Sequence, residues 1–452
     1  MFDLNSLCSS SFAPSQSFAQ RSANLHSSLM DPFMSLPAEI IQEIIFYTAD
    51  FTGMESLLSA SLWVNTIFKA QPRRITLDLI KTNPITTMPE IQQLLRSIAI
   101  IESPSTSCTN LENYLHICTI NDNDSTRSGA PDLLPDQITT PEIFHIVRIA
   151  ANIQRLACMC LYTIQQNFIS AVANSLGSAA SQRAAEPIVW IEEYRVCWTL
   201  WHLQHYSALR KTAKYRWGWP NESVKKLADT YTTLNNISAI LPEQMWTVAA
   251  ILADLGLRPL YGHSTNKKKE NKDEEGHEEE SSEAAWEFPT ETPIPFFSSL
   301  ELPRRHSDYP TWSPPPVPDA NSKIEETWSR APRHRFVGSN PAGMIRAHTN
   351  LISRYPGFKQ SWRDIRQIRP FRRIGVMLWN RWRMYSVGLY SSISRGREVC
   401  TPDGDVVQAD DFQLSPYDVI SRWLALVGKP PPDVGENYEN GNSTLARYIN
   451  PH

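Results

Sequence analysis

Hydrophobic positions between about residues 34 and 261 recur with helical spacing, and the period-two runs typical of strands are scarce. The longest signal runs from Pro141 to about Val172, where apolar side chains recur every three or four positions. Thr140 is the expected N-cap, and Pro141 suits the first helical position, where its missing N–H costs nothing. The pattern predicts one long helix with a continuous buried stripe.

Three further amphipathic helices are predicted after this one. The first covers about 189–211 and is rich in tryptophan, the second follows Pro220, and the third starts at Pro242. Gly256 can end the third helix in the left-handed conformation. Consecutive helices of this kind indicate an α-helical domain, which we assign to residues 76–262.

Polar and proline-rich segments divide the chain. Residues 1–30 are rich in serine and predict a disordered leader, with translation starting at either Met1 or Met30. Residues 263–320 combine a charge run with nine prolines between Pro289 and Pro318, so we expect a disordered acidic and proline-rich linker or insertion. Residues 321–452 form a basic, tryptophan-rich helical C-terminal part, with helices expected at about 371–389 and 416–427.

Residues 31–75 predict a very small three-helix unit. Leu36 and Pro37 open the first helix, whose isoleucines at 40, 41, 44 and 45 form a stripe wide enough to face two neighbours. A turn is expected at 50–53, followed by short helices over 54–61 and 62–70. So small a unit buries too little surface to be stable alone. It therefore needs the adjoining helical domain, a partner protein, or both.

Composition and charge exclude several classes of protein. The chain of 452 residues has 43 Lys and Arg against 47 Asp and Glu, so it is not a strongly basic nucleic-acid binder as a whole. Its seven cysteines are odd in number and scattered, which favours a reducing compartment over a disulfide framework. No CxxC pair occurs, which argues against a zinc ribbon. No apolar run approaches the roughly 18 residues that span a bilayer. We expect a cytoplasmic or nuclear protein without a membrane anchor.

Other candidates for chemistry are weak. Cys197, His202 and His205 lie on one predicted helix, and the two histidines share a face, but packing explains them better than a metal does. The tryptophans of that helix are expected in the core rather than around a ligand. Phosphate-loop, dinucleotide, zinc-protease and serine-hydrolase motifs are absent. We therefore predict no enzyme, no catalytic residue, no metal and no cofactor.

A basic segment is the main alternative candidate. Residues 354–397 hold eleven Lys and Arg and a single acid, Asp364, with tryptophans between them. Such a surface suits phosphates, stacked bases or an acidic partner, although a solvated basic face is the commoner outcome. The arginines of this possible basic patch are Arg363, Arg366, Arg369, Arg372, Arg373, Arg381 and Arg383.

The order of motifs in 35–75 resembles an F-box. Leu-Pro-x-Glu-Ile opens it, Ile-Ile-x-Tyr closes the first helix, and a Leu-Leu segment precedes Ala-Ser-x-Trp-Val-Asn-x-Ile-Phe. The segment 190–220 is in turn similar to the helical region of many filamentous-fungal F-box-like proteins. Ser61-Leu62-Trp63-Val64 departs from the Cys or Ser, Arg and Trp that the third helix often carries.

The resemblance implies a non-catalytic adaptor role. F-box proteins bind a Skp-type adaptor, which bridges to a cullin–RING ubiquitin ligase, while the rest of the chain holds a target protein that the sequence does not identify. By this analogy, the adaptor-binding residues are Leu36, Pro37, Ile40, Ile44, Leu57, Leu58, Val64 and Ile67. The alternative is a non-catalytic helical protein that binds nucleic acid or an acidic partner through 354–397.

Overall fold

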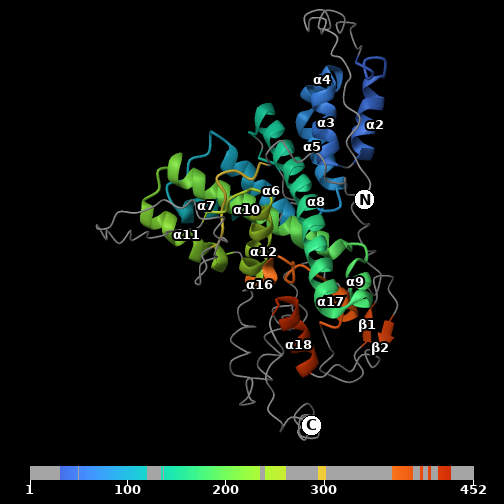
Figure 1. Ribbon diagram of the computed structural model, residues 1–452. Helices are drawn as coiled ribbons and strands as arrows, with labels where there is room; N and C mark the ends of the chain where they lie inside the picture. Colours follow the sequence, from blue (N-terminus) through green and yellow to red (C-terminus); the bar gives the residue numbers. More distant parts are fainter. Residues whose placement is uncertain are drawn as a thin grey trace, which may run out of the picture.

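A computed structural model describes residues 31–48, 50–119, 134–135, 137–234, 240–260, 294–301, 369–389, 398–400, 406–408 and 416–428. The fold is mostly helical, as predicted, with one small two-stranded antiparallel sheet among the described residues (Figure 1). The elements are α2 (Ala38–Thr48), α3 (Phe51–Ala60), α4 (Leu62–Ala70), α5 (Pro72–Thr82), α6 (Pro89–Glu102), α7 (Leu111–Thr119), α8 (Thr140–Leu176), α9 (Ser178–Ala184), α10 (Trp190–Tyr215), α11 (Asn221–Leu234), α12 (Ile240–Asp254), α16 (Arg369–Arg372), α17 (Arg381–Ser386), β1 (Glu398–Cys400), β2 (Val406–Gln408) and α18 (Pro416–Leu426). The leader 1–30, most of 263–320 and the end of the chain lie outside the described residues.

The long helix α8 forms the axis of the molecule (Figure 1). Its N-cap is Thr139 rather than Thr140, and the Glu142 side chain accepts a hydrogen bond from the Thr139 backbone N–H, as in a capping box. Fifteen of its residues are buried, and it packs against α3, α5, α10 and α18. It is long and apolar enough to cross a membrane by composition alone, but its buried stripe is what a core helix requires.

The N-terminal helices α2 to α5 stand at one end of α8 (Figure 1). The predicted turn at 50–53 is shorter than expected, because Asp50 caps α3 by accepting hydrogen bonds from the backbone N–H groups of Thr52 and Gly53. A fourth helix, α5, packs on α2 and α4, so the predicted boundary at residue 75 falls inside a helix. The small unit is thus completed by α5 and α8, as its size requires.

The second central helix of the core, after α8, is α10, which packs on α6, α8, α11 and α12. Trp190, Trp198, Trp201 and Trp219 are buried there, which confirms that the tryptophan cluster belongs mainly to the core. Gly256 adopts a positive φ of 90° after α12, as predicted. The buried hydrophobic residues form one cluster in space, whose members range from Ile41 to Leu426. This cluster crosses the domain boundaries predicted from the sequence.

The described helices of the C-terminal part, α16, α17 and α18, pack on this core against α12, α9 and α8. The single helix expected at 371–389 is wrong: α16 and α17 are short, and the chain turns between them at Gly375, with a φ of 68°. Only glycine adopts this backbone easily. The turn brings residues 371–380 against α8, α10 and α12, where hydrogen bonds from Asn167, Arg195 and Gln244 reach its carbonyl oxygens.

Gly375→Ala is expected to destabilise the protein by roughly 2–3 kcal/mol. A Cβ at this position would lie 2.0 Å from Cγ2 of Ile164 in α8 and would also strain the positive φ. Urea unfolding measures the loss. Gly428→Ala is the matched control, because Gly428 has nearly the same φ, 69°, but open space around its Cβ position. Equal losses in the two variants would show that the contact with Ile164 contributes nothing.

Candidate functional site

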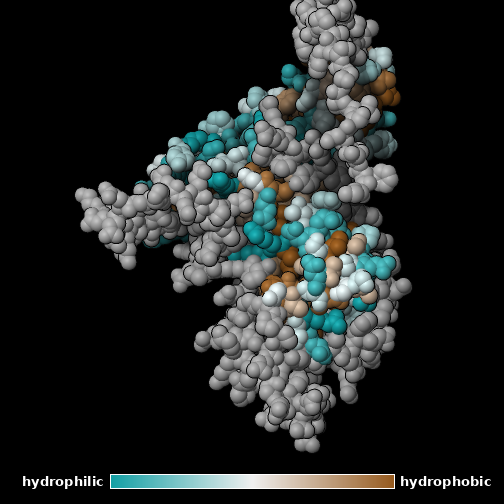
Figure 2. All heavy atoms as spheres, viewed as in Figure 1, coloured by the Kyte–Doolittle hydropathy of each residue, from teal (hydrophilic) through white to brown (hydrophobic). Residues whose placement is uncertain are grey.

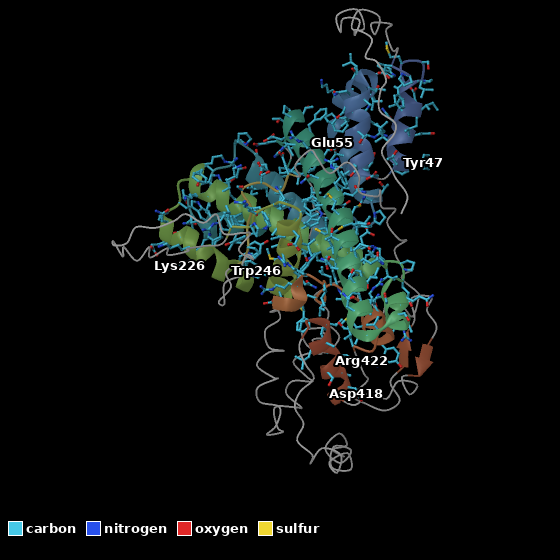
Figure 3. All side chains as sticks on the ribbon, in the orientation of Figure 1. Tyr47, Glu55, Lys226, Trp246, Asp418 and Arg422 are labelled. Carbon is cyan, nitrogen blue, oxygen red and sulfur yellow. The ribbon has the colours of Figure 1, made fainter. Side chains whose placement is uncertain are left out.

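The isoleucine stripe of α2 divides into two faces in the structure. Ile41 and Ile45 are buried between α2 and its neighbours, whereas Ile40 is 43% exposed and Ile44 is half-buried. Tyr47 lies on the same outer side, seven residues or about two helical turns after Ile40, and it is 79% exposed (Figure 3). The stripe therefore packs inward against α3, α4 and α5, while Ile40 and Tyr47 stay exposed on its outer side.

The segment before α2 extends this apolar surface toward α4. The Ser61 hydroxyl donates to the Asp31 carboxylate at 2.6 Å, and the indole N–H of Trp63 donates to the carbonyl of Leu36 at 3.2 Å. These bonds hold the segment beside the start of α4, where Leu62 is 78% exposed. We call the combined surface the outer apolar face; its members are Met34, Pro37, Ile40, Ile44, Tyr47 and Leu62.

The structure separates the predicted adaptor-binding residues into two groups. Pro37 and Ile40 are exposed, and Leu36, Ile44 and Leu57 are half-buried at the surface. Leu58, Val64 and Ile67 are instead buried in the core of the chain, so their side chains are not available to a partner in this conformation.

Met34, Tyr47 and Leu62 belong to the outer apolar face but were not among the adaptor-binding residues predicted from the sequence. The spacing of seven between Ile40 and Tyr47 was a usable signal, because it returns to the same side of a helix. The exposure of Leu62 follows from the capping of α4 by Ser61, which accepts from the Val64 N–H at 3.0 Å and fixes where that helix begins.

Two of the seven arginines of the possible basic patch, Arg372 and Arg383, do not lie at the surface. Arg372 and Arg383 are buried and bind carboxylates: Arg372 pairs with Glu243 at 2.9 Å, and Arg383 with Glu192 at 2.9 Å. Arg373 is exposed and pairs with Asp254 at 3.1 Å. The prediction that Arg372 and Arg383 belong to a basic surface is therefore wrong, because acids of the helical core bind and neutralise them. Arg363 and Arg366 lie outside the described residues, as do the side chains of Arg369 and Arg381.

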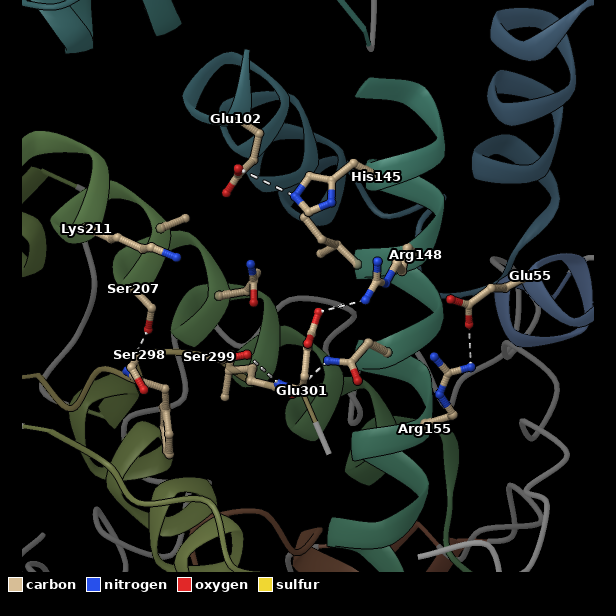
Figure 4. A pocket seen from close by; sticks show the side chains of 16 residues that line it. Glu55, Glu102, His145, Arg148, Arg155, Ser207, Lys211, Ser298, Ser299 and Glu301 are labelled. Carbon is tan, nitrogen blue, oxygen red and sulfur yellow. Dashed lines mark hydrogen bonds and ion pairs between the residues drawn. The ribbon is translucent and has the colours of Figure 1, made fainter. Parts of the chain in front are cut away.

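A polar cleft of about 720 Å³ opens on the side of α8 that faces α10 (Figure 4). Two ion pairs cross its walls: Glu55 of α3 with Arg155 at 2.6 Å, and Glu301 with Arg148 at 3.2 Å. In addition, the Glu102 carboxylate of α6 lies 3.5 Å from Nε2 of His145. Such partly exposed pairs contribute little to stability. Acids and bases balance in the cleft, so it favours neither an anion nor a cation as a ligand.

The segment 294–301 forms one edge of this cleft (Figure 4). Its Phe297 N–H donates to the Ser207 hydroxyl at 2.9 Å, and its Leu300 carbonyl accepts from Asn152 at 2.8 Å. This part of the predicted linker 263–320 is ordered against the core. Its apolar residues Ile294, Phe297 and Leu300 are buried, which explains why proline content alone gave the wrong prediction for it.

The two histidines of α10 share a face, as predicted, and bind a tyrosine. Nδ1 of His202 and Nδ1 of His205 both lie 2.9 Å from the Tyr231 hydroxyl, and Nε2 of His205 lies 2.7 Å from the Tyr114 hydroxyl. Within the described residues, no group of three His, Cys, Asp or Glu side chains is placed to hold a metal. Hydrogen bonding within the core therefore accounts for both histidines.

His205 should make the fold sensitive to acid. Burial lowers its pKa to about 4, against 6.5 for an ordinary histidine. Between these values the unfolded chain binds more protons than the folded one, so the free energy of unfolding falls as the pH falls, by about 2 kcal/mol at pH 5. Urea unfolding at pH 7 and pH 5 measures this difference.

The free energy of unfolding of His205→Gln should therefore fall by about 2 kcal/mol less between pH 7 and pH 5 than that of the wild type. His116→Gln, at an exposed position on α7, should leave the wild-type difference unchanged. A wild-type pH dependence in His205→Gln would mean that the imidazole is protonated in the folded state.

Comparisons with known proteins found no relative. No protein-family model, curated protein or solved structure matches the chain significantly. Function is therefore inferred from the arrangement of the side chains.

Proposed function

We propose that this chain is an F-box-like substrate-recognition subunit. It would bind a Skp-type adaptor through the outer apolar face and present a target protein to a cullin–RING ubiquitin ligase. One observation supports this most: five of the eight large exposed apolar side chains among the described residues lie within residues 34–62. Exposed apolar side chains gathered in this way are typical of interaction sites.

The chemistry of the outer apolar face suits a protein partner. Hydrophobic surface is visible on the N-terminal helices at the upper right of Figure 2. Burying a fully exposed isoleucine contributes roughly 1.5–3 kcal/mol, and Ile40, which is 43% exposed, would gain part of this on binding. Tyr47, which packs edge-on against Phe46 with ring centroids 5.6 Å apart, is the type of residue that dominates interface energies.

The attachment of this face to the rest of the chain suits a scaffold. Phe51 and Met54 of α3 are buried against the helical domain, and Phe68 of α4 contacts Phe144 of α8 with ring centroids 4.7 Å apart. A rigid connection would hold a bound target at a fixed distance from the adaptor. This raises the effective concentration of target lysines near the ligase without any bond chemistry in this chain.

The alternative function is binding of nucleic acid or an acidic partner through 354–397. The burial of Arg372 and Arg383 leaves fewer charges for such a surface. Salt separates the two proposals, because phosphate binding weakens steeply with salt whereas burial of apolar side chains does not.

Co-purification of the full chain with a fungal Skp-type adaptor tests the proposal. We expect a complex that survives about 0.5 M salt, at which charge interactions are screened beyond a few ångströms. Binding of a nucleic acid that disappears over the same range, together with no adaptor complex from well-folded chain, would favour the alternative.

A further inference from the structure

A second cavity, of about 220 Å³, lies among α6, α7, α10 and α11. Close-packed cores contain few voids larger than a water molecule, and an apolar cavity of about 150 Å³ is enough to bind benzene. Gln93 and Cys118 line it and are at least partly exposed, whereas Leu209 and Leu227 line it and are buried. The cavity therefore reaches from the surface into the core.

The walls of this cavity differ in character. Leucines supply the apolar part, namely Leu94, Leu111, Leu115, Leu209 and Leu227. The polar part is a hydrogen-bonded chain that runs from Tyr114 through His205 and Tyr231 to His202. Hydroxyl and imidazole groups both donate and accept hydrogen bonds. An aromatic ring would fit among the leucines, with a polar atom turned toward the chain of tyrosines and histidines.

The charges of the lining exclude an anionic ligand. No Lys or Arg is among the described residues that line the cavity, and the charged residue there is the acid Glu90. Burial keeps His205 neutral near pH 7 by lowering its pKa. A carboxylate or phosphate would be buried without a counter-charge, which is costly. The lining therefore excludes an anion, and a neutral ligand fits the leucines and the hydrogen-bonded tyrosines and histidines without needing a counter-charge.

We propose that this cavity, which we call the His–Tyr pocket, binds a small neutral planar molecule of about the size of phenol or indole, with a hydroxyl or N–H group at one end. Small-molecule sites typically combine apolar walls with a few convergent polar groups in this way. The proposal is independent of adaptor binding, because the His–Tyr pocket and the outer apolar face share no residue.

Titration calorimetry of the full chain with phenol, indole and benzoate tests this proposal. For ligands of this size we expect dissociation constants on the order of 0.1–1 mM for phenol or indole. Benzoate, which has a similar ring but a negative charge, should bind at least about tenfold more weakly.

Substitutions in α7 provide matched variants. Leu115→Trp fills the cavity from a half-buried lining position and should weaken phenol and indole binding by roughly tenfold or more. Ile117→Trp makes the same change at a half-buried position of the same helix that does not line the cavity, so it should leave the affinity unchanged. Gln93→Trp, at an exposed lining position, carries the expectation of Leu115→Trp if that variant does not fold.

Two results would overturn the proposal. One is the absence of phenol and indole binding to well-folded wild type at concentrations of several millimolar. The other is binding that Leu115→Trp and Gln93→Trp leave unchanged, which would place the ligand elsewhere. Benzoate binding as tight as that of phenol would overturn the assignment of a neutral ligand.

Discussion

Replacing Arg383 by methionine is expected to lower the free energy of unfolding by about 3–5 kcal/mol. The Arg383 guanidinium is buried and donates two hydrogen bonds to Glu192, both at 2.9 Å. It also donates to the carbonyl oxygens of Ala184, Glu186 and Pro187 at 2.8–3.0 Å. All five N–H groups of this arginine are therefore used, which only a planar guanidinium can achieve.

The cost of this substitution arises mainly from Glu192. Its carboxylate is fully buried and also accepts hydrogen bonds from the backbone N–H groups of Val189 and Asn380. Burial acts to lower the pKa of Arg383, but the attraction and hydrogen bonds of Glu192, together with the attraction of Glu186, outweigh it and raise that pKa. Without the arginine, a buried negative charge loses its counter-charge, and the C-terminal part loses its main polar link to α9 and α10.

Arg373→Met is the matched control for Arg383→Met. Arg373 also pairs with an acid, Asp254 at 3.1 Å, but it is exposed and so should cost less than about 1 kcal/mol. Urea unfolding compares the two variants. Similar small losses would contradict the view that residues 369–389 are held on the core by the Glu192–Arg383 pair.

The second large effect is expected at the outer apolar face. Ile40→Glu should weaken binding of a Skp-type adaptor at least about 100-fold, because it removes an apolar contact and places a charge in a desolvated interface. The stability of the free chain should change little, since Ile40 is already 43% exposed. Titration calorimetry of the full chain with the adaptor measures the affinity.

Tyr162→Glu is the control for Ile40→Glu. Tyr162 is 42% exposed on α8, so the same charge is introduced at an equal exposure but away from the N-terminal helices. It should leave adaptor affinity within about twofold of wild type. A loss of affinity in both variants, or in neither, would argue against the outer apolar face as the docking surface.

Much of the helical architecture was predictable because local signals determine it. The stripe from Ile143 onward gave α8. Pro220 marked the start of α11 and Gly256 the end of α12, whereas α12 begins at Ile240, two residues before the predicted Pro242. The N-cap of α8 was misplaced by one residue because Thr139 and Thr140 are equally suitable by type. Only the side chain of Glu142, which reaches back to Thr139, distinguishes them.

The features that depend on contacts between distant residues were not predictable. Arg372 and Arg383 look like surface charges in the sequence, because their partners Glu243 and Glu192 are more than 100 positions away. The turn at Gly375 depends on the backbone approaching Ile164 across the core. Along α2, the packing of α4 and α5 decides which isoleucines are buried and which are exposed, and the sequence of α2 alone does not determine this packing.

Photo-crosslinking from the outer apolar face tests the proposed function most directly. A photoreactive phenylalanine derivative would replace Tyr47, which is 79% exposed, or Tyr215, which is 75% exposed at the end of α10. In the purified complex with a Skp-type adaptor, we expect a crosslink to the adaptor from position 47 and none from position 215. A crosslink from position 215 alone, or no complex at all with well-folded chain, would contradict an F-box-like docking role for these helices.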